Sequence, residues 1–313
     1  MVEDLKYARD TVSVSQLKEQ IEGLKKEKNA VILAHNYTSS DVQDVADFIG
    51  DSLGLSLEAS RTTADIIVFC GVSFMGETAK LLNPKKTVLL PVPEAYCAMA
   101  SMCNADQLKD FRKNNPGYAI VGYVNSTAES KAEMDICCTS SNALQVVESL
   151  PEKNILFVPD RNLGAYVASR SDKNIKLWNG FCPIHHGITV GQVEPLIAKH
   201  PDAMVLAHPE CRTEVLKLAD FIGSTESMAE TARRSDRKEF IILTEVGMKE
   251  KLEKLCPKKV FLFPSNAICT TMKMIDLNSI LRTLEKGEGE VVLDNDLADL
   301  AKRPVEKMVH IPN

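Results

Sequence analysis

Three cysteines recur at a regular spacing and have the chemistry to hold a metal centre. Cys97, Cys182 and Cys269 lie 85 and 87 residues apart, each after a short extended run. Three convergent thiolates can bind zinc with one open coordination position, or three irons of a [4Fe-4S] cluster with the fourth iron open. Structural zinc sites usually contain C-x-x-C pairs, and this sequence has none. The spacing therefore favours a cluster held by three loops, with zinc as the alternative.

The other six of the nine cysteines are predicted to be inert thiols. An odd number of cysteines behind an N-terminus without an apolar export signal argues against a disulfide framework. Three of them lie in apolar runs and are expected to fill the core, and three occur at positions without a repeat. In that order they are Cys70, Cys137 and Cys138, and then Cys103, Cys211 and Cys256.

Pairs of polar residues follow three apolar runs and are candidates for proton transfer and substrate binding. Residues i and i+2 of an extended segment point the same way, so each pair would face one side. A lone histidine at a strand end is more often an ordinary hydrogen-bonding residue, but recurrence at intervals of 88 and 85 residues favours a functional role. The pairs are His35 and Tyr37, Tyr123 and Asn125, and His208 and Glu210.

Hydroxyl residues recur with the same period at the next turn of each segment. Ser52, Ser140 and either Ser224 or Thr225 precede helical patterns, which predicts that they cap helices. Three helix N-termini around one cavity would attract a substrate with several carboxylate or phosphate groups. Every repeat of the fold needs helix caps for structural reasons alone. These hydroxyls are therefore weaker evidence for a functional site than the histidine, tyrosine and glutamate residues.

The landmarks share one period near 87 residues, which indicates a small domain present three times. Each copy opens with a similar dipeptide, namely Gln16-Leu17, Gln107-Leu108 and Gln192-Val193. Short apolar runs alternate with helical patterns, which predicts parallel sheets covered on both faces. Functional residues collect beyond the carboxyl ends of such strands.

The predicted fold class is therefore α/β, with three α/β/α sandwich domains, each with a small parallel sheet, related by a pseudo-threefold axis around a central active site. The expected boundaries are 1–103 with an N-terminal helix, 104–188, 189–272, and a C-terminal extension, 273–313, that packs on the first repeat.

Composition excludes several classes of protein. The 313 residues are 44% hydrophobic and 26% charged, which is typical of a globular chain and not of a disordered one. A net charge of −6 argues against nucleic acid as the main partner. No apolar run approaches the roughly 18 residues of a membrane span, and Met1 to Asp10 is charged. We therefore expect a cytoplasmic protein with no membrane association.

The combination of motifs resembles the quinolinate synthase family. The resemblance covers nearly the whole chain, from about Gln16 to beyond Cys269. The strings that carry it are Ala34-His35-Asn36-Tyr37, Asp47-Phe48-Ile49-Gly50-Asp51-Ser52, Tyr123-Val124-Asn125-Ser126-Thr127-Ala128, Cys182-Pro183-Ile184-His185 and His208-Pro209-Glu210-Cys211.

The resemblance implies a [4Fe-4S] enzyme that condenses iminoaspartate with dihydroxyacetone phosphate, releasing quinolinate, phosphate and two waters in NAD synthesis. It also implies an aspartate-oxidising enzyme as the source of iminoaspartate. By motif, Cys97, Cys182 and Cys269 match the cluster ligands, and Tyr37, Glu210 and His208 match catalytic positions. Positions that bind substrate are matched by His35, Ser52, Tyr123, Asn125, Ser140, His208, Glu210 and Thr225.

Two rival functions differ from this one. A hydroxymethylbutenyl diphosphate reductase also has three cysteines and an open iron, but the His-Pro-Glu-Cys string and the lack of a Thr-rich diphosphate motif count against it. A non-catalytic metal or solute carrier built from three α/β domains is the other alternative.

For the enzyme, we expect a raised pKa at Glu210. Apolar walls beside a cluster would raise the pKa of this glutamate towards a useful acid/base range.

Overall fold

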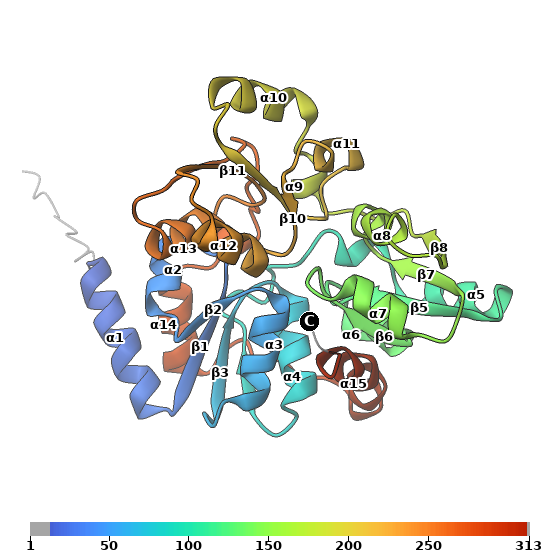
Figure 1. Cartoon of the computed structure of the whole chain (residues 1–313). Coiled ribbons are helices and arrows are strands. Elements are labelled where there is room, and N and C mark those ends of the chain that lie inside the picture. The colour runs from blue at the N-terminus through green and yellow to red at the C-terminus, as the bar shows by residue number, and fades with distance from the viewer. Residues whose placement is uncertain (1–12, 312–313) are drawn as a thin grey trace, which may run out of the picture.

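The computed structural model describes residues 13–311 and contains three four-stranded sheets whose strands all pair in parallel (Figure 1). Residues 1–12, which include the charged N-terminal segment, and residues 312–313 lie outside this description. Each sheet follows the same rule, with the first strand of its unit beside the second and third, and the fourth at the far edge. The predicted α/β class with three repeated units is confirmed.

The three units contain the following elements. The first has α1 (Val14–Glu27), β1 (Ala30–His35), α2 (Ser40–Val45), β2 (Phe48–Gly50), α3 (Ser52–Arg61), β3 (Ile66–Cys70), α4 (Ser73–Leu82), β4 (Thr87–Leu89) and the 3-10 helix η1 (Ala100–Met102). The second has α5 (Ala105–Asn114), β5 (Tyr118–Tyr123), α6 (Ala128–Ala132), β6 (Ile136–Cys138), α7 (Ala143–Ser149), β7 (Asn154–Val158), α8 (Arg161–Ala168), β8 (Asn174–Leu177) and α9 (Pro183–His186). The third has α10 (Val190–Lys199), β9 (Met204–Ala207), α11 (Thr213–Leu216), β10 (Phe221–Ile222), α12 (Thr225–Arg234), β11 (Glu239–Leu243), α13 (Met248–Leu255), β12 (Val260–Leu262) and η2 (Met272–Met274). Helices α14 (Leu277–Lys286) and α15 (Asn295–Val309) follow.

The repeated glutamine starts the first helix of each unit. The side-chain oxygens of Gln16, Gln107 and Gln192 each accept the backbone N–H of the residue three positions earlier, at 2.8, 3.0 and 2.9 Å. This reciprocal cap satisfies one of the N–H groups that a helix start leaves unpaired. The next residue along the chain is apolar and buried in every unit, so the dipeptide both begins the helix and seats it on its sheet.

An aspartate fastens the edge strand to the first strand in each unit. Asp47, Asp135 and Asp220 directly precede β2, β6 and β10, and their Oδ2 atoms accept the N–H groups of Ile32, Ile120 and Val205 at 2.8, 2.7 and 2.8 Å. Edge strands of two or three residues form few ladder bonds, so this side-chain bond fixes where they pair. The same period of 88 and 85 residues relates the three aspartates.

The first sheet is buried on both faces, as its continuous apolar strands predict. Ile32 and Ala34 of β1 pack into the cluster that includes α1 and α14, whereas Leu33 between them packs into a larger cluster on the opposite face. Strand β3 divides its side chains in the same alternating way. Helices on both sides are therefore required, and the sheet ends become the places left for polar side chains.

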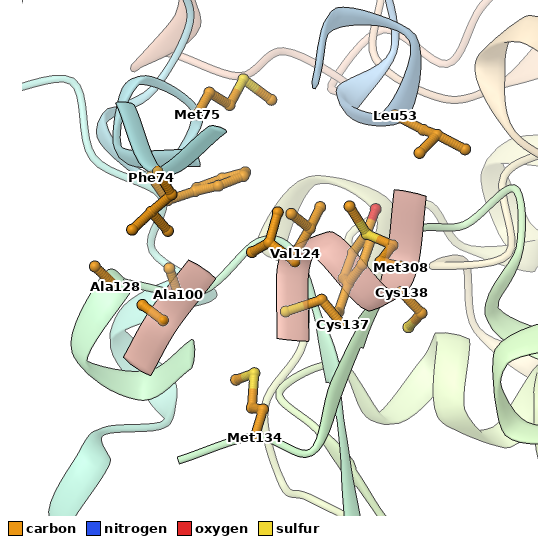
Figure 2. Packing of buried hydrophobic residues seen from close by; sticks show 14 of the residues in the cluster. Leu53, Phe74, Met75, Ala100, Val124, Ala128, Met134, Cys137, Cys138 and Met308 are labelled. Carbon is orange, nitrogen blue, oxygen red and sulfur yellow. The ribbon is translucent and has the colours of Figure 1, made fainter. Parts of the chain in front are cut away.

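The first and second units share one hydrophobic cluster (Figure 2). Phe74 and Met75 of α4 lie in it with Val124 and Met134 of the second unit, and Met308 of α15 joins them. The strands and longer helices of the third unit bury their apolar residues in two further clusters, whereas Met272 of η2 lies in the cluster shared by the first two units. Apolar packing thus fixes two of the units against each other.

The two C-terminal helices pack in different places. Helix α14 lies against α1 and β3 of the first unit, whereas α15 lies against α6 and β6 of the second unit and α4 of the first (Figure 1). The apolar face of α15, with Ala301, Val305 and Met308 fully buried, accounts for this bridging position. The expected extension on the first repeat therefore describes α14, and the domain boundaries stay a prediction.

None of the helices within residues 13–311 combines the length and the apolar character that a bilayer crossing requires.

We expect Asp135→Ala to lower the free energy of unfolding by about 1–3 kcal/mol, because the N–H of Ile120 loses a charged acceptor. The measurement is the midpoint of urea unfolding, with Asp172→Ala as the control because Asp172 is exposed. Equal midpoints for the two variants would contradict the role assigned to the aspartate.

Candidate active site

A cavity of about 270 Å³ lies between the three units and collects every predicted site residue. The residues come from the loops after the first strands, from the starts of helices and from the three cysteine loops. The lining includes His35, Tyr37, Ser52, Cys97, Tyr123, Asn125, Ser140, Cys182, His208, Glu210, Thr225 and Cys269. The other six cysteines are buried and do not belong to this lining. The period seen in the sequence therefore corresponds to convergence on one place.

Two histidines in equivalent positions are held in the same tautomer. Nδ1 of His35 accepts the backbone N–H of Tyr37 at 3.2 Å, and Nδ1 of His208 accepts that of Glu210 at 3.4 Å. Burial lowers the pKa of each imidazole to about 3. Each ring is thus neutral near pH 7 with its proton on Nε2, a donor for an oxygen atom in the cavity.

Glu210 is a fully enclosed carboxylate surrounded by donors. Its Oε2 lies 2.8 Å from Nδ1 of His185, and the hydroxyl of Tyr123 donates a hydrogen bond to the same group. Burial by itself would raise the pKa, but His185, His208 and Tyr123 together lower the pKa of Glu210 to about 2. The expectation of a raised pKa was wrong, because sequence alone does not reveal the donors. Glu210 is ionised at neutral pH and can accept a proton.

Tyr37 belongs to a second hydrogen-bonded group. Its hydroxyl lies 2.8 Å from Oγ1 of Thr244 and 3.4 Å from Nε2 of His185. Burial, followed by the charge of Glu210, raises the pKa of Tyr37 well above its usual value. Tyr37 is therefore a neutral donor, and His185 stands between it and Glu210.

His185 and Thr244 were missed as site residues. His185 lies on α9, three residues beyond Cys182. The signal that would have singled it out is this spacing, because residues i and i+3 of a helical turn share a face. Thr244 follows β11 directly and carries no repeated signal, so only the structure reveals it.

Two of the three predicted hydroxyl caps are shifted by one or two positions, and the third, for which Ser224 was one of two candidates, is confirmed. The N-cap of α3 is Asp51, so Ser52 is the first helical residue, and the N-cap of α7 is Asn142. Ser224 caps α12 and Thr225 follows it. The side chains of Asp51 and Ser224 accept helix N–H groups, which leaves the hydroxyls of Ser52 and Thr225 for the cavity, whereas Asn142 makes no side-chain cap bond.

Ser140 and Ser141 have different partners. The hydroxyl of Ser140 lies 3.2 Å from Nε2 of His208, whereas that of Ser141 lies 3.1 Å from Oδ2 of Asp51. Thr225 accepts a hydrogen bond from the amide of Asn36 at 2.9 Å. Ser140 is the serine of this pair that lines the cavity, while Ser141 links the first two units through Asp51.

Asn125 carries an unsatisfied polar atom in the cavity. Its Oδ1 is buried and has no hydrogen-bond partner among the described residues. A buried amide without a partner costs about 1–3 kcal/mol, so this group is suited to a ligand. Lysine and arginine are absent from the described residues that line the cavity, so an anion there must be met by neutral donors and helix N-termini.

The three cavity cysteines are free thiols with hydrogen bonds at sulfur. Backbone N–H groups of Met99 and Ala100 donate to Cys97, and Nδ1 of His185 lies 3.3 Å from Sγ of Cys182. Sγ of Cys269 lies 3.3 Å from the hydroxyl of Thr271. Burial, with smaller contributions from the nearby Glu210 and Cys269, raises the pKa of Cys97 to about 12. A bound cation would have to displace these protons.

The fold and the cavity define a class of enzyme that forms one site from three repeated α/β units, with thiols on one set of loops and acid/base groups on another. The family model described as "Quinolinate synthetase A protein" matches residues 19–310. The chain belongs to this family.

Curated relatives extend over nearly the whole chain. The quinolinate synthase of Methanosarcina barkeri is 50% identical over 298 residues, which cover 95% of this chain and 98% of the relative. That of Aquifex aeolicus is 47% identical over 305 residues, or 95% of each chain, and that of Geobacter metallireducens is 48% identical over 297 residues, or 95% of this chain and 98% of the relative. The resemblance seen in the motifs is confirmed.

The depressed pKa of Glu210 predicts a contribution to acid stability. The group is ionised in the folded chain down to a pH of about 2, below its unfolded pKa, so its contribution is present near pH 7 and is lost as the pH falls from about 4.5 to 2. In the chain without bound metal, we expect Glu210→Gln to lose less unfolding free energy than the wild type over this range.

The control is Glu230→Gln. Arg233 and Arg234 lower the pKa of Glu230 to about 2, but Glu230 is exposed to solvent. Added salt should abolish the effect of the Glu230 substitution and leave that of Glu210 in place, because buried charges are screened less. Identical pH profiles for the wild type and Glu210→Gln would refute the electrostatic account.

Proposed function

We propose that this chain is a quinolinate synthase that condenses iminoaspartate with dihydroxyacetone phosphate to give quinolinate, phosphate and two waters. The observation that supports this reaction best is the convergence of three cysteine loops and two histidine-containing pairs on one cavity, in a chain of this family. The reaction needs no oxidant, since the atoms and electrons of the two substrates balance those of the products.

The three cavity thiols fit a [4Fe-4S] cluster with three protein ligands. Cys97, Cys182 and Cys269 come from equivalent loops, remain free of disulfides and are the cysteines that face the cavity. N–H and O–H donors at their sulfurs are the contacts that stabilise thiolate ligands. When bound, the cluster supplies a Lewis-acidic iron with an open coordination position.

The proton transfers are assigned to Glu210 and Tyr37. Ring formation with loss of water requires removal of a proton from carbon and delivery of a proton to a departing oxygen. Ionised Glu210 is the base for the first step, and the hydroxyl of Tyr37 is a donor for the second. His185 contacts both, 2.8 Å from Glu210 and 3.4 Å from Tyr37, and can carry a proton between them. His208 holds substrate oxygen through Nε2–H.

The substrate carboxylates are assigned to neutral donors. His35, Ser52, Ser140 and Thr225 surround the cavity, and Ser52 and Thr225 begin helices whose N-termini favour negative charge. Tyr123 and Asn125 also line the cavity, and the unpartnered Oδ1 of Asn125 is an acceptor for an N–H or O–H group of the substrate. An aspartate-oxidising enzyme supplies the iminoaspartate, and the reaction takes place in the cytoplasm.

A single divalent metal is the second candidate occupant. One ligand atom each from Cys182, His185 and Glu210 lie within 4.8 Å of one another, a set that zinc accepts. This set leaves Cys97 and Cys269 without a role and removes Glu210 as a base. Iron content distinguishes the two, because a cluster contains four irons and sulfide whereas this set holds one metal ion.

We expect Cys97→Ala, Cys182→Ala and Cys269→Ala each to prevent assembly of a full cluster and to abolish quinolinate formation, since each removes one of three ligands. Cys70→Ala and Cys256→Ala are the controls, because those thiols are buried away from the cavity. Iron and sulfide per chain after anaerobic purification, with the absorbance near 400 nm, are the measurements. A colourless, iron-free wild type would overturn the cluster, and normal iron in the Cys182 variant would overturn the ligand set.

We expect Glu210→Gln and Tyr37→Phe to reduce turnover by roughly a hundredfold or more while quinolinate still binds, because each removes a proton-transfer group and keeps the side-chain shape. Single-turnover assays and quinolinate titration are the measurements. Phe181→Leu is a control outside the cavity lining. Near-normal turnover with a raised KM in Glu210→Gln would make Glu210 a binding residue instead.

A further inference from the structure

Two buried carboxylates hold the backbone of two of the cavity cysteines. Oδ2 of Asp160 accepts the N–H of Cys182 at 2.9 Å, and Oε1 of Glu245 accepts the N–H of Cys269 at 3.0 Å. Both carboxylates have no exposed surface. They occupy the same place in their units, two residues beyond the third strand, β7 or β11.

The first unit lacks this device. Val72 stands two residues beyond β3, in the position of Asp160 and Glu245, and has no polar side chain to offer. Contacts at sulfur do not compensate for this, since Cys97 receives a backbone N–H from Ala100 just as Cys182 receives one from His185. A carboxylate at this position is therefore not required by the fold itself, and its presence in two units needs another explanation.

Each carboxylate also lies in a chain of contacts to an acid/base residue. Glu245 forms an ion pair with Lys273 at 3.1 Å, and Lys273 donates to the backbone carbonyl of Tyr37. Asp160 caps α8 by accepting the N–H of Leu163 at 2.7 Å. On the first turn of the same helix, the amide of Asn162 donates to the backbone carbonyl of Glu210 at 2.9 Å.

We propose that Asp160 and Glu245 are positioning residues that fix the Cys182 and Cys269 loops in place as cluster ligands and set them in register with Glu210 and Tyr37. The inference rests on the proposed cluster. A ligand loop with a free backbone would lose conformational entropy when it binds metal, and an N–H held by a buried carboxylate has lost that entropy already.

The test compares Asp160→Asn and Glu245→Gln with Glu77→Gln. In each variant an amide replaces a carboxylate that accepts a backbone N–H, but Glu77 accepts that of Ala128, away from the cysteine loops. The rate at which a chelator removes iron from the reconstituted protein should rise about tenfold or more in the first two variants and stay unchanged in the third.

The reduction potential of the cluster supplies a readout that loss of stability alone would not move. It should shift in Asp160→Asn and in Glu245→Gln, because a loosened ligand loop alters the contacts at the cluster sulfurs, and stay unchanged in Glu77→Gln. Melting of the metal-free variants checks folding, and Glu245→Asp, whose shorter side chain cannot reach the N–H of Cys269 in the same way, should also lose iron faster. If both amide variants lose iron at the wild-type rate and keep the wild-type reduction potential, the inference is wrong, whereas the proposed cluster is unaffected. An iron-free wild type would overturn the proposed function, and this inference with it.

Discussion

A carboxylate buried where the units meet is the constraint on which the rest of the site depends. Glu210 has almost no exposed surface, and a buried charge is tolerated only when it is paired and hydrogen-bonded. Its partners come from other parts of the chain, with Tyr123 at the end of β5 and His185 on α9. The ionised state of Glu210 therefore requires the second and third units to be in register. The charge of this one side chain thus depends on how the two units pack against each other.

Neutral donors dominate the remainder of the cavity. His35 and His208 are deprotonated by burial, and their backbone contacts place the one ring proton on Nε2. A site without lysine or arginine among its described lining residues binds an anion less by charge than by direction, because each donor has a fixed geometry.

Repetition made the fold and most site positions predictable from sequence, whereas contacts between units were not. A period near 87 residues located the three sheets and the side chains at the ends of their first strands, because parallel strands end at one edge. The repeated aspartates before β2, β6 and β10 followed the same period and were overlooked as structural residues. His185 and Thr244 come from positions without a repeat, and the low pKa of Glu210 depends on partners far away in sequence.

In the proposed reaction, the differences between the repeats carry the chemistry. All three units keep the glutamine cap and the aspartate at the edge strand, which only maintain the fold. The residue two positions beyond the first histidine or tyrosine differs in each, as Tyr37, Asn125 and Glu210, and so offers a donor, an amide and a base to one cavity. A symmetric scaffold brings three equivalent positions to one axis, but a substrate without threefold symmetry needs three different groups there. Divergence at these positions, against constancy at the caps, is what a site shared by three copies requires.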